Sequence, residues 1–265
     1  MSASSGTQTR PDDTAEHTGV YVYGIVPADV EVQESAKGVG DPPAEVEVIR
    51  EGDIAALVST VALDQPLGRP QDLQAHAQLL DGTAGVAPVL PLRFGAVLTD
   101  AESVAGELLR DHHDEFAQAL EALEGRAEYI VKGRYDETVF LSRLLSDNAE
   151  AAQLRDDIQS KPEDASRDSQ IALGELVANA VEQQRQQHTK AVAEALGDLS
   201  EHLNPRDPAH EWDAVHLALL IEVARQAELE EVVDRLNKEW GDLVTLRLLG
   251  PLAPYDFVVT TNPEV

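Results

Sequence analysis

Two segments, in each of which an apolar run lies next to glycine and proline, most limit the folds and functions that this chain can have. They read VLPLRFGAV at residues 89–97 and GPLAPYDFV at residues 250–258. Each pattern predicts a strand that runs into a defined bend, because proline restricts the backbone and glycine permits turns. Neither segment holds a nucleophile with a base, a set of metal ligands or a phosphate-binding loop. We therefore expect the chain to bind a partner rather than to catalyse a reaction.

The charge balance narrows the choice of partner. The chain carries 49 Asp and Glu against 20 Lys and Arg, for a formal net charge of −29, and only five of the cations are Lys. Such a chain repels phosphate backbones and anionic lipid surfaces, so nucleic acid and membranes are not expected as partners. The acidity is consistent both with a general need for solubility and with adaptation to a high-salt cytoplasm.

Composition also limits the cellular compartment that is expected and the kinds of chemical site that the chain can form. The 265 residues include no cysteine, which excludes disulfides, thiolate zinc sites and cysteine catalysis and fits a reducing cytoplasm. No apolar stretch approaches the roughly 20 residues that a membrane helix needs. Residues 1–18 are polar and acidic, unlike a secretion signal, and are predicted to be a disordered tail.

The first half of the chain predicts an α+β domain over residues 19–125. Apolar and β-branched runs predict strands at 20–26, 54–61 and 91–97, and an alternating run predicts one at 45–48. A helix is expected after Pro70. A second is expected from about Ala101, capped by Thr99 or Asp100 and ended by Gly125.

The second half predicts another α+β domain over residues 126–265. Strands are expected at 127–134, 213–223 and 243–249, and helices at 136–160, 168–203 and about 229–240. The order strand–helix–strand–helix–strand is that of a modified ferredoxin-like sheet, with extra helices inserted in its first crossover. The predicted fold class is therefore α+β with two domains.

Three candidate chemical sites have simpler explanations. The neighbouring His112 and His113 point about 100° apart on a helix, so a solvated acidic face explains them better than a metal site. His76 lies among apolar residues and is expected to be buried and hydrogen-bonded. Gly38 and Gly40 lack the third glycine and the following helix of a phosphate loop. We predict no catalytic, cofactor-binding or metal-binding residues.

The candidate binding residues lie in the two bends. Arg93 stands between Leu92 and Phe94 in an apolar segment. A buried guanidinium needs a carboxylate, so we expect an ion pair of Arg93 within the chain, with a contact between Arg93–Phe94 and a partner as the other interpretation. Tyr255 and Phe257 are also candidate interface residues, because aromatic side chains often anchor interfaces.

Nearly the whole chain after residue 18 resembles the gas vesicle GvpF/GvpL family. The motifs that carry the resemblance, besides His76, are YVYGIV at 21–26, DIAALVS at 53–59, LPLRFG at 90–95, the strand at 126–132 and GPLAPYDFV at 250–258. Leu252 and Ala253 depart from the family, which often has an aromatic residue and a second proline there. The resemblance implies two α+β domains, the second of them modified ferredoxin-like. It also implies a cytoplasmic, vesicle-associated accessory or minor structural protein that binds the shell protein GvpA and other accessory proteins.

Two other classes of function compete with this assembly role. The first alternative is a ferredoxin-like sensory module that binds a small ligand between its sheet and helices. It would require a compact pocket with converging polar groups. The second is an enzyme, which would require an acid–base pair clustered in a cleft.

Overall fold

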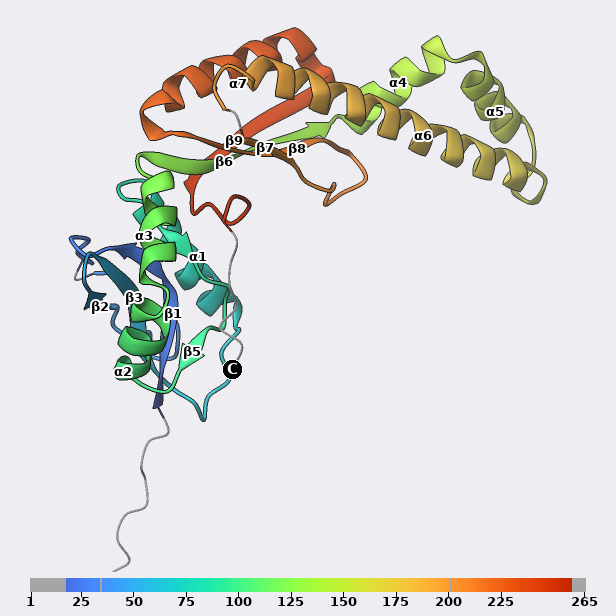
Figure 1. The fold of residues 1–265 in the computed structure, drawn as a ribbon. Coiled ribbons are helices and arrows are strands. Elements are labelled where there is room, and N and C mark those ends of the chain that lie inside the picture. The colour runs from blue at the N-terminus through green and yellow to red at the C-terminus, as the bar shows by residue number, and fades with distance from the viewer. Residues whose placement is uncertain (1–17, 34, 201, 259–265) are drawn as a thin grey trace, which may run out of the picture. The chain divides into compact units, whose positions relative to one another are not determined.

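The computed structural model describes residues 18–258 except 34 and 201 (Figure 1). The predicted disordered tail lies outside these residues, apart from Thr18. The described residues form two compact units, each built on its own antiparallel sheet. The first unit holds residues 18–79 and 92–116, and the second holds residues 80–91 and 117–258. The domain boundary expected near Gly125 stays a prediction, because compactness does not test which segments fold independently.

The first sheet is built around β1 (Thr18–Pro27). This strand pairs antiparallel with β3 (Ile54–Ala62) on one side and with β5 (Val97–Leu98) on the other. Strand β2 (Glu47–Glu51) pairs with the far edge of β3 through a turn at Gly52, whose φ of +63° favours glycine. The predicted strands at 20–26 and 54–61 are confirmed. The strand expected at 45–48 begins two residues later. The single strand expected at 91–97 is wrong: β4 (Leu90–Pro91) and β5 are two short strands, because the chain turns at Phe94 and Gly95 between them.

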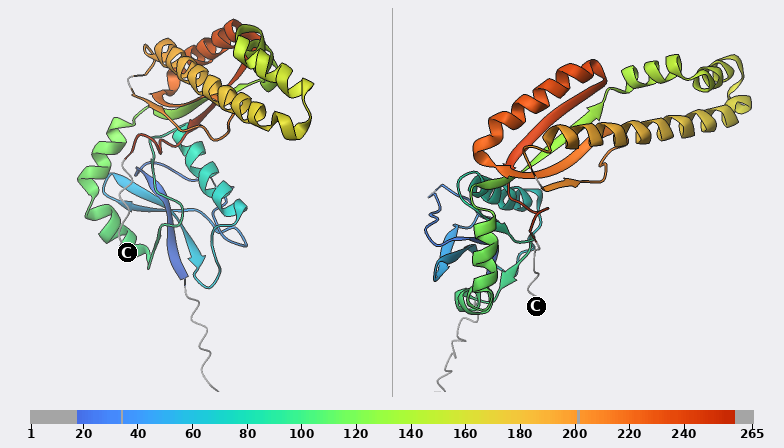
Figure 2. Two further views of the ribbon diagram at one scale, coloured as in Figure 1. Left: turned by 90° about the vertical axis from the view of Figure 1, so that its right-hand side faces the viewer. Right: turned by 45° about the horizontal axis from the view of Figure 1, so that its top comes forward.

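Helical segments flank this sheet (Figure 2, left). The helix expected after Pro70 is α1 (Pro70–Ala84). The helix expected from Ala101 starts as predicted with α2 (Ala101–Ser103), because the Asp100 carboxylate accepts a hydrogen bond from the Ser103 amide at 2.8 Å. It then widens into a π-helical segment, η1 (Val104–Arg110), before α3 (His113–Ala122). Val104 and Leu109 are both buried in η1, and their spacing of five residues matches the wider turn of a π-helix rather than a period of 3.6 residues.

The second sheet has four strands in the order β7-β8-β6-β9, all antiparallel to their neighbours. The strands are β6 (Arg126–Tyr135), β7 (His202–Pro205), β8 (Asp213–Glu222) and β9 (Val244–Leu252). Central strands β6 and β8 are paired with Val131 opposite Leu217. Their side chains are nearly all buried, which explains the apolar runs Tyr129–Val131 in β6 and Leu217–Ile221 in β8.

Helices follow β6 and β8 in this unit. They are α4 (Glu137–Asp147), α5 (Ala149–Ser160), α6 (Glu163–Leu196) and α7 (Gln226–Trp240), with the short turns η2 (Val223–Arg225) and η3 (Gly241–Leu243) on either side of α7. The C-terminal part of α6 and the whole of α7 cover one face of the sheet, and α4 and α5 run beside the outer part of α6 (Figure 1). No helix among the described residues is both long enough and apolar enough to cross a membrane.

Two predictions for this unit are wrong. The single helix expected over 136–160 is divided at Asn148, whose extended backbone ends α4 and whose side chain caps α5 through the Ala151 amide at 3.0 Å. The long helix ends at Leu196 rather than Leu203, and the missed strand β7 follows. Leu203 has the right helical spacing but pairs with Leu219 of β8 instead. The helix also begins at Glu163, directly after Pro162, rather than at Asp168.

Candidate functional site

Arg93 lies on the surface of the first unit. The segment that carries it runs along β1, where the Leu92 amide donates to the Tyr23 carbonyl at 2.9 Å and the Val22 amide donates to the Ala96 carbonyl at 2.9 Å. Leu92 is buried, whereas the next residue, Arg93, is exposed. Arg93 has no ion pair with any described residue. The expected internal ion pair is therefore wrong, because the guanidinium stays in solvent and needs no buried carboxylate.

Phe94 anchors this segment on a buried aromatic cluster. Its ring centroid lies 5.8 Å from that of Tyr21 and 5.6 Å from that of His76. His76 is 4% exposed, and its Nδ1 is 2.8 Å from the Tyr21 hydroxyl. Burial lowers the pKa of His76 to about 4, so its ring is neutral at pH 7. The prediction of a buried, hydrogen-bonded His76 is confirmed. This packing fixes Phe94 while Arg93 beside it remains available to a partner.

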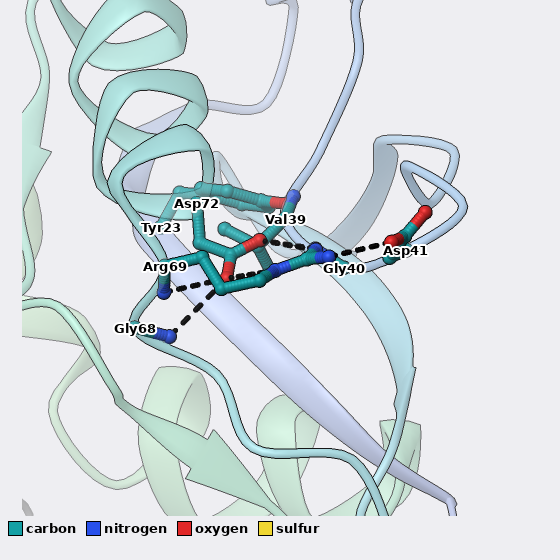
Figure 3. A network of polar contacts seen from close by, with 7 residues as sticks. All are labelled: Tyr23, Val39, Gly40, Asp41, Gly68, Arg69 and Asp72. Carbon is teal, nitrogen blue, oxygen red and sulfur yellow. Dashed lines mark hydrogen bonds and ion pairs between the residues drawn. The ribbon is translucent and has the colours of Figure 1, made fainter.

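A polar network centred on Asp72 holds the loop that follows β1 (Figure 3). The Asp72 carboxylate accepts hydrogen bonds from the amides of Gly40 at 3.0 Å, Gly68 at 3.2 Å and Arg69 at 3.0 Å. The Arg69 guanidinium bonds the same carboxylate at 3.1 Å and that of Asp41 at 2.6 Å. These contacts, led by the one with Arg69, hold the pKa of Asp72 well below its usual range. The Gly40 amide that a phosphate loop would offer is thus already bound to a carboxylate.

A small hollow beside this network does not have the features of a ligand site. It encloses about 290 Å³ and is lined by Pro42, Pro66, Leu67 and Arg69, among others. The charged groups at this place satisfy one another, since Arg69 bonds both Asp72 and Asp41. The converging polar groups that a small-ligand module would need are therefore used within the network.

A second network fastens the closing segment, residues 253–257, to the sheet of the second unit. Glu128 of β6 is 2% exposed, and its Oε1 accepts from Arg206 Nη2 at 2.8 Å. Arg206 also clamps Asp256 with Nε at 2.6 Å and Nη2 at 2.7 Å. The other Glu128 oxygen accepts from the Asp256 amide at 3.0 Å. One guanidinium is therefore shared by two carboxylates that lie far apart in the sequence.

This arrangement shifts the titration of Glu128. Burial raises the pKa of Glu128 to about 7, and the nearby Asp256 carboxylate adds to the rise, whereas Arg206 and the Asp256 amide oppose it. Asp81, at the end of α1, is another carboxylate near this site, and its Oδ1 accepts from the Ala253 amide at 2.9 Å. Burial raises the pKa of Asp81 as well. Around neutral pH, protonation at this cluster is therefore coupled to how the closing segment is held.

Tyr255 and Phe257 lie on the turn that this second network holds. The Tyr255 amide donates to the Ala253 carbonyl at 2.8 Å, and the Phe257 amide donates to the Pro254 carbonyl at 3.1 Å. Tyr255 is 37% exposed and Phe257 is half-buried. Burial, with the carboxylates of Asp81 and Glu128, raises the pKa of the Tyr255 hydroxyl far above its usual range. The turn thus displays an uncharged aromatic ring on a fixed backbone.

The four candidate interface residues divide between the units. Arg93 and Phe94 belong to the first, and Tyr255 and Phe257 belong to the second. Sequence reasoning did not single out Glu128, Arg206 or Asp256 for a structural role. The one available signal was that Glu128 lies between the apolar residues Ala127 and Tyr129 of a predicted strand, because a buried carboxylate must find a cation or amide partner.

The neighbouring histidines contact acidic side chains. His113 Nε2 lies 2.7 Å from Asp53 Oδ1 and His112 Nδ1 lies 3.6 Å from Glu115 Oε2. Within residues 18–258, as far as they are described, no cluster of three or more His, Asp or Glu side chains is arranged to hold a metal ion. These contacts agree with the interpretation of His112 and His113 as part of a solvated acidic face.

Comparison with known proteins identifies the family. Residues 19–259 match the family described as gas vesicle synthesis protein GvpL/GvpF. The chain belongs to this family. Gas vesicle protein F of Streptomyces sp. (strain CB03234) is 34% identical over 90% of this chain and 98% of its own length. Gas vesicle protein L of the same strain is 30% identical over 92% of this chain and 94% of its own length.

Solved structures support the same fold. The crystal structure of the gas vesicle protein GvpF from Anabaena sp. PCC7120 superposes with a TM-score of 0.74, at 23% identity, over 92% of this chain and 100% of that one. GvpF from Microcystis aeruginosa superposes with a TM-score of 0.68 at 25% identity, over 90% of this chain and 98% of that one. The GvpL/GvpF resemblance seen in the sequence motifs is confirmed, and the fold is the α+β, two-sheet fold of GvpF.

Proposed function

We propose that this gas vesicle protein assists vesicle assembly in the cytoplasm by binding the shell protein GvpA and other gas vesicle proteins. The observation that carries the proposal is the placement of Arg93. It is an exposed cation without an ion partner among the described residues, in a chain with 29 excess negative charges. A cation kept free in such surroundings is suited to a carboxylate or carbonyl on another protein. The proposal assigns the chain no catalytic step, cofactor or metal.

Four residues would supply the contacts. Arg93 offers charge and hydrogen bonds, and Phe94 beside it is held by the aromatic cluster, so little side-chain entropy is lost on binding. Tyr255 and Phe257 offer aromatic surface on the fixed closing turn. Aromatic and arginine side chains are enriched among the residues that contribute most to interface energies.

The acidic surface has a role in this function. A shell subunit that assembles through apolar surfaces needs a partner that keeps it dispersed before assembly. A complex with a chain of net charge −29 repels other such complexes in solution. The acidity therefore favours limited, controlled delivery over aggregation.

We further propose that the second unit is a modified ferredoxin-like domain. Its elements follow one another as strand, helices, strand, strand, helix, strand, with the order β7-β8-β6-β9 in the sheet. This β-α-β-β-α-β succession is the pattern of that fold. Helices α4 and α5, with the outer part of α6, would be the insertion in the first crossover.

Co-expression with GvpA tests the proposed binding function. An affinity-tagged chain is purified, and the GvpA recovered per mole of chain is measured by quantitative mass spectrometry. We expect Arg93→Glu to reduce the recovered GvpA about tenfold, which corresponds to ~1.4 kcal/mol. Arg235→Glu is the matched control, because Arg235 is also an exposed arginine without an ion pair among the described residues, but on α7. Equal recovery with Arg93→Glu and Arg235→Glu would contradict the assignment of Arg93, and no GvpA with the unaltered chain would contradict the function.

A further inference from the structure

The helical insertion of the second unit contains an apolar groove that the interface residues above do not use. It encloses about 810 Å³ between α4, α5, α6 and the loop ahead of β8. Its apolar lining includes Leu141, Ile158, Leu173, Val177, Val181 and Trp212. Figure 1 shows α4 and α5 beside the outer part of α6. Trp212 is one of only two tryptophans in the chain, so the groove holds one of the largest apolar side chains available.

The groove is open along one face of α6. Leu173 and Val177 are half-buried, and the small residue that follows each of them, Gly174 and Ala178, is exposed. A Cβ atom added at Gly174 would meet no heavy atom within 4 Å. Small residues on an open helix face allow a second backbone to approach closely, and the larger side chains on either side provide apolar contacts. This face is therefore shaped for another helix.

The length of the groove fits the same occupant. Along α6 it extends from Gln170 to Arg185. At 1.5 Å per residue this is about 22 Å, or roughly four turns of helix. A small molecule would leave most of this length uncovered.

The rim determines the charge of the occupant. Glu137, Glu182 and Glu211 lie along the groove, and Arg185 is its only Lys or Arg. The Arg185 guanidinium is engaged by its own chain: Nη1 pairs with Glu182, Nε bonds the Asp213 carbonyl at 2.7 Å, and Nη2 bonds the Glu211 carbonyl at 2.7 Å. The rim is therefore negative on balance, and the surrounding chain adds to that potential. A second copy of this acidic chain would be repelled, whereas a cationic segment would be attracted.

We propose that this groove binds an amphipathic helix of about four turns, with an apolar stripe flanked by Lys and Arg, from another protein. The inference rests on the proposed function only in that this protein would be another gas vesicle component. Burial of the apolar stripe against Val177 and Trp212 provides the affinity. The glutamates on the rim select the charge and the orientation of the helix.

Designed peptides test the groove directly. The first probe is a fluorescent 15-residue peptide with leucines on one helical face and lysines elsewhere, a length of about four turns. The second probe replaces each lysine with glutamate, and the third has the composition of the first in scrambled order, without the apolar face. Binding to the full chain is measured by fluorescence anisotropy at constant ionic strength. We expect the first peptide to bind at least about tenfold more tightly than either of the others, or ~1.4 kcal/mol.

Two neighbouring substitutions locate the binding. Ala178→Arg places a bulky cation in the groove, and Asn179→Arg adds the same charge at the adjacent exposed position, which does not line the groove. We expect Ala178→Arg to weaken binding of the first peptide about tenfold and Asn179→Arg to change it less than about twofold. Circular dichroism and melting temperature check that both variants fold.

Three results would overturn the inference. They are equal binding of the lysine and glutamate peptides, equal effects of the two arginine substitutions, and self-association of the chain that Ala178→Arg abolishes. The last result would identify a second copy as the occupant. The amount of GvpA recovered with the Ala178→Arg variant distinguishes a failure of this inference from a failure of the proposed function. Loss of peptide binding with full recovery of GvpA would leave the function intact and assign the groove to another partner, as the inference allows.

Discussion

Replacing Glu128 with glutamine should flatten the pH dependence of stability. In the native protein, Glu128 is 2% exposed and shares Arg206 with Asp256, and its pKa is raised from 4.5 to about 7. Its charged form is therefore less favourable in the folded protein than in the unfolded chain, mainly because burial removes water from the carboxylate. Glutamine keeps the size of the side chain and removes the titration.

The sign and size of the effect follow from proton linkage. Between pH 4.5 and about 7 the folded protein holds a proton on Glu128 that the unfolded chain has released. The contribution of Glu128 to stability is thus full below pH 4.5 and is lost as the pH rises through 7. The whole difference is on the order of 3 kcal/mol at ~1.36 kcal/mol per pKa unit. About 2 kcal/mol of it falls between about pH 5.5 and pH 8.

The pH dependence of stability has to be compared between the unaltered chain and Glu128→Gln, because other groups in the chain also titrate. His76 acts in the opposite direction, because its lowered pKa makes the folded protein more stable as the pH rises from about 4 to 6.5. Urea unfolding at several pH values from about 5.5 to 8 therefore has to be measured for the unaltered chain and for Glu128→Gln, since the His76 contribution cancels in their difference. We expect the unaltered chain to lose about 2 kcal/mol relative to Glu128→Gln over this range.

A matched control makes the test decisive. Glu47→Gln removes an exposed carboxylate from β2 and should leave the pH dependence unchanged. Parallel curves for the unaltered chain and Glu128→Gln would refute the reasoning. They would mean that Arg206 and the Asp256 amide fully compensate for the burial of Glu128.

Three further outcomes are expected. Arg93→Ala should change the free energy of unfolding by less than about 0.5 kcal/mol while reducing recovery of GvpA, because Arg93 is exposed; a clear drop in urea midpoint would reveal a structural contact. Gly250→Ala should destabilise the chain by about 1–3 kcal/mol in urea unfolding, because φ is +138° and the new Cβ would lie 2.5 Å from Tyr129 Cδ1. The control Gly174→Ala, in an open helical position, should stabilise the chain by about 0.5–1 kcal/mol. If both substitutions changed the free energy of unfolding in the same direction, the proposed backbone requirement for glycine at position 250 would be wrong. The melting temperature should rise from about 0.1 M to 1 M KCl, because the Debye length falls from about 10 Å to 3 Å and screens the repulsion of 29 excess charges; a flat response would exclude a high-salt adaptation.

Strands with continuous apolar sequence were predictable because the pattern itself reports burial. Strands β1, β3 and β8 were all found in this way, within one or two residues of their observed ends. The family resemblance was equally accessible, since its motifs are local. Where tertiary pairing outweighs local spacing, prediction was wrong: Leu203 continues the helical period of α6 but pairs with Leu219 in the sheet.

The sites were less predictable than the strands. The burial of His76 follows from its apolar neighbours, but the exposure of Arg93 depends on how the segment between β4 and β5 turns, and the sequence alone does not decide that. The cluster of Glu128, Arg206 and Asp256 joins residues separated by 78, 50 and 128 positions. No local pattern links such residues, because only the topology of the sheet brings them together.

That separation also affects the order in which the second unit folds. Strand β6 is central, yet its neighbour β9 begins more than a hundred residues later in the chain. During synthesis, Glu128 is made before Arg206 and Asp256. Its carboxylate can therefore be both buried and paired only after those two residues have been added to the chain. Contacts of such high sequence separation slow folding, because the intervening chain loses entropy before the contacts form. The second unit is therefore expected to fold late, which leaves an interval in which its incomplete sheet is exposed to chaperones.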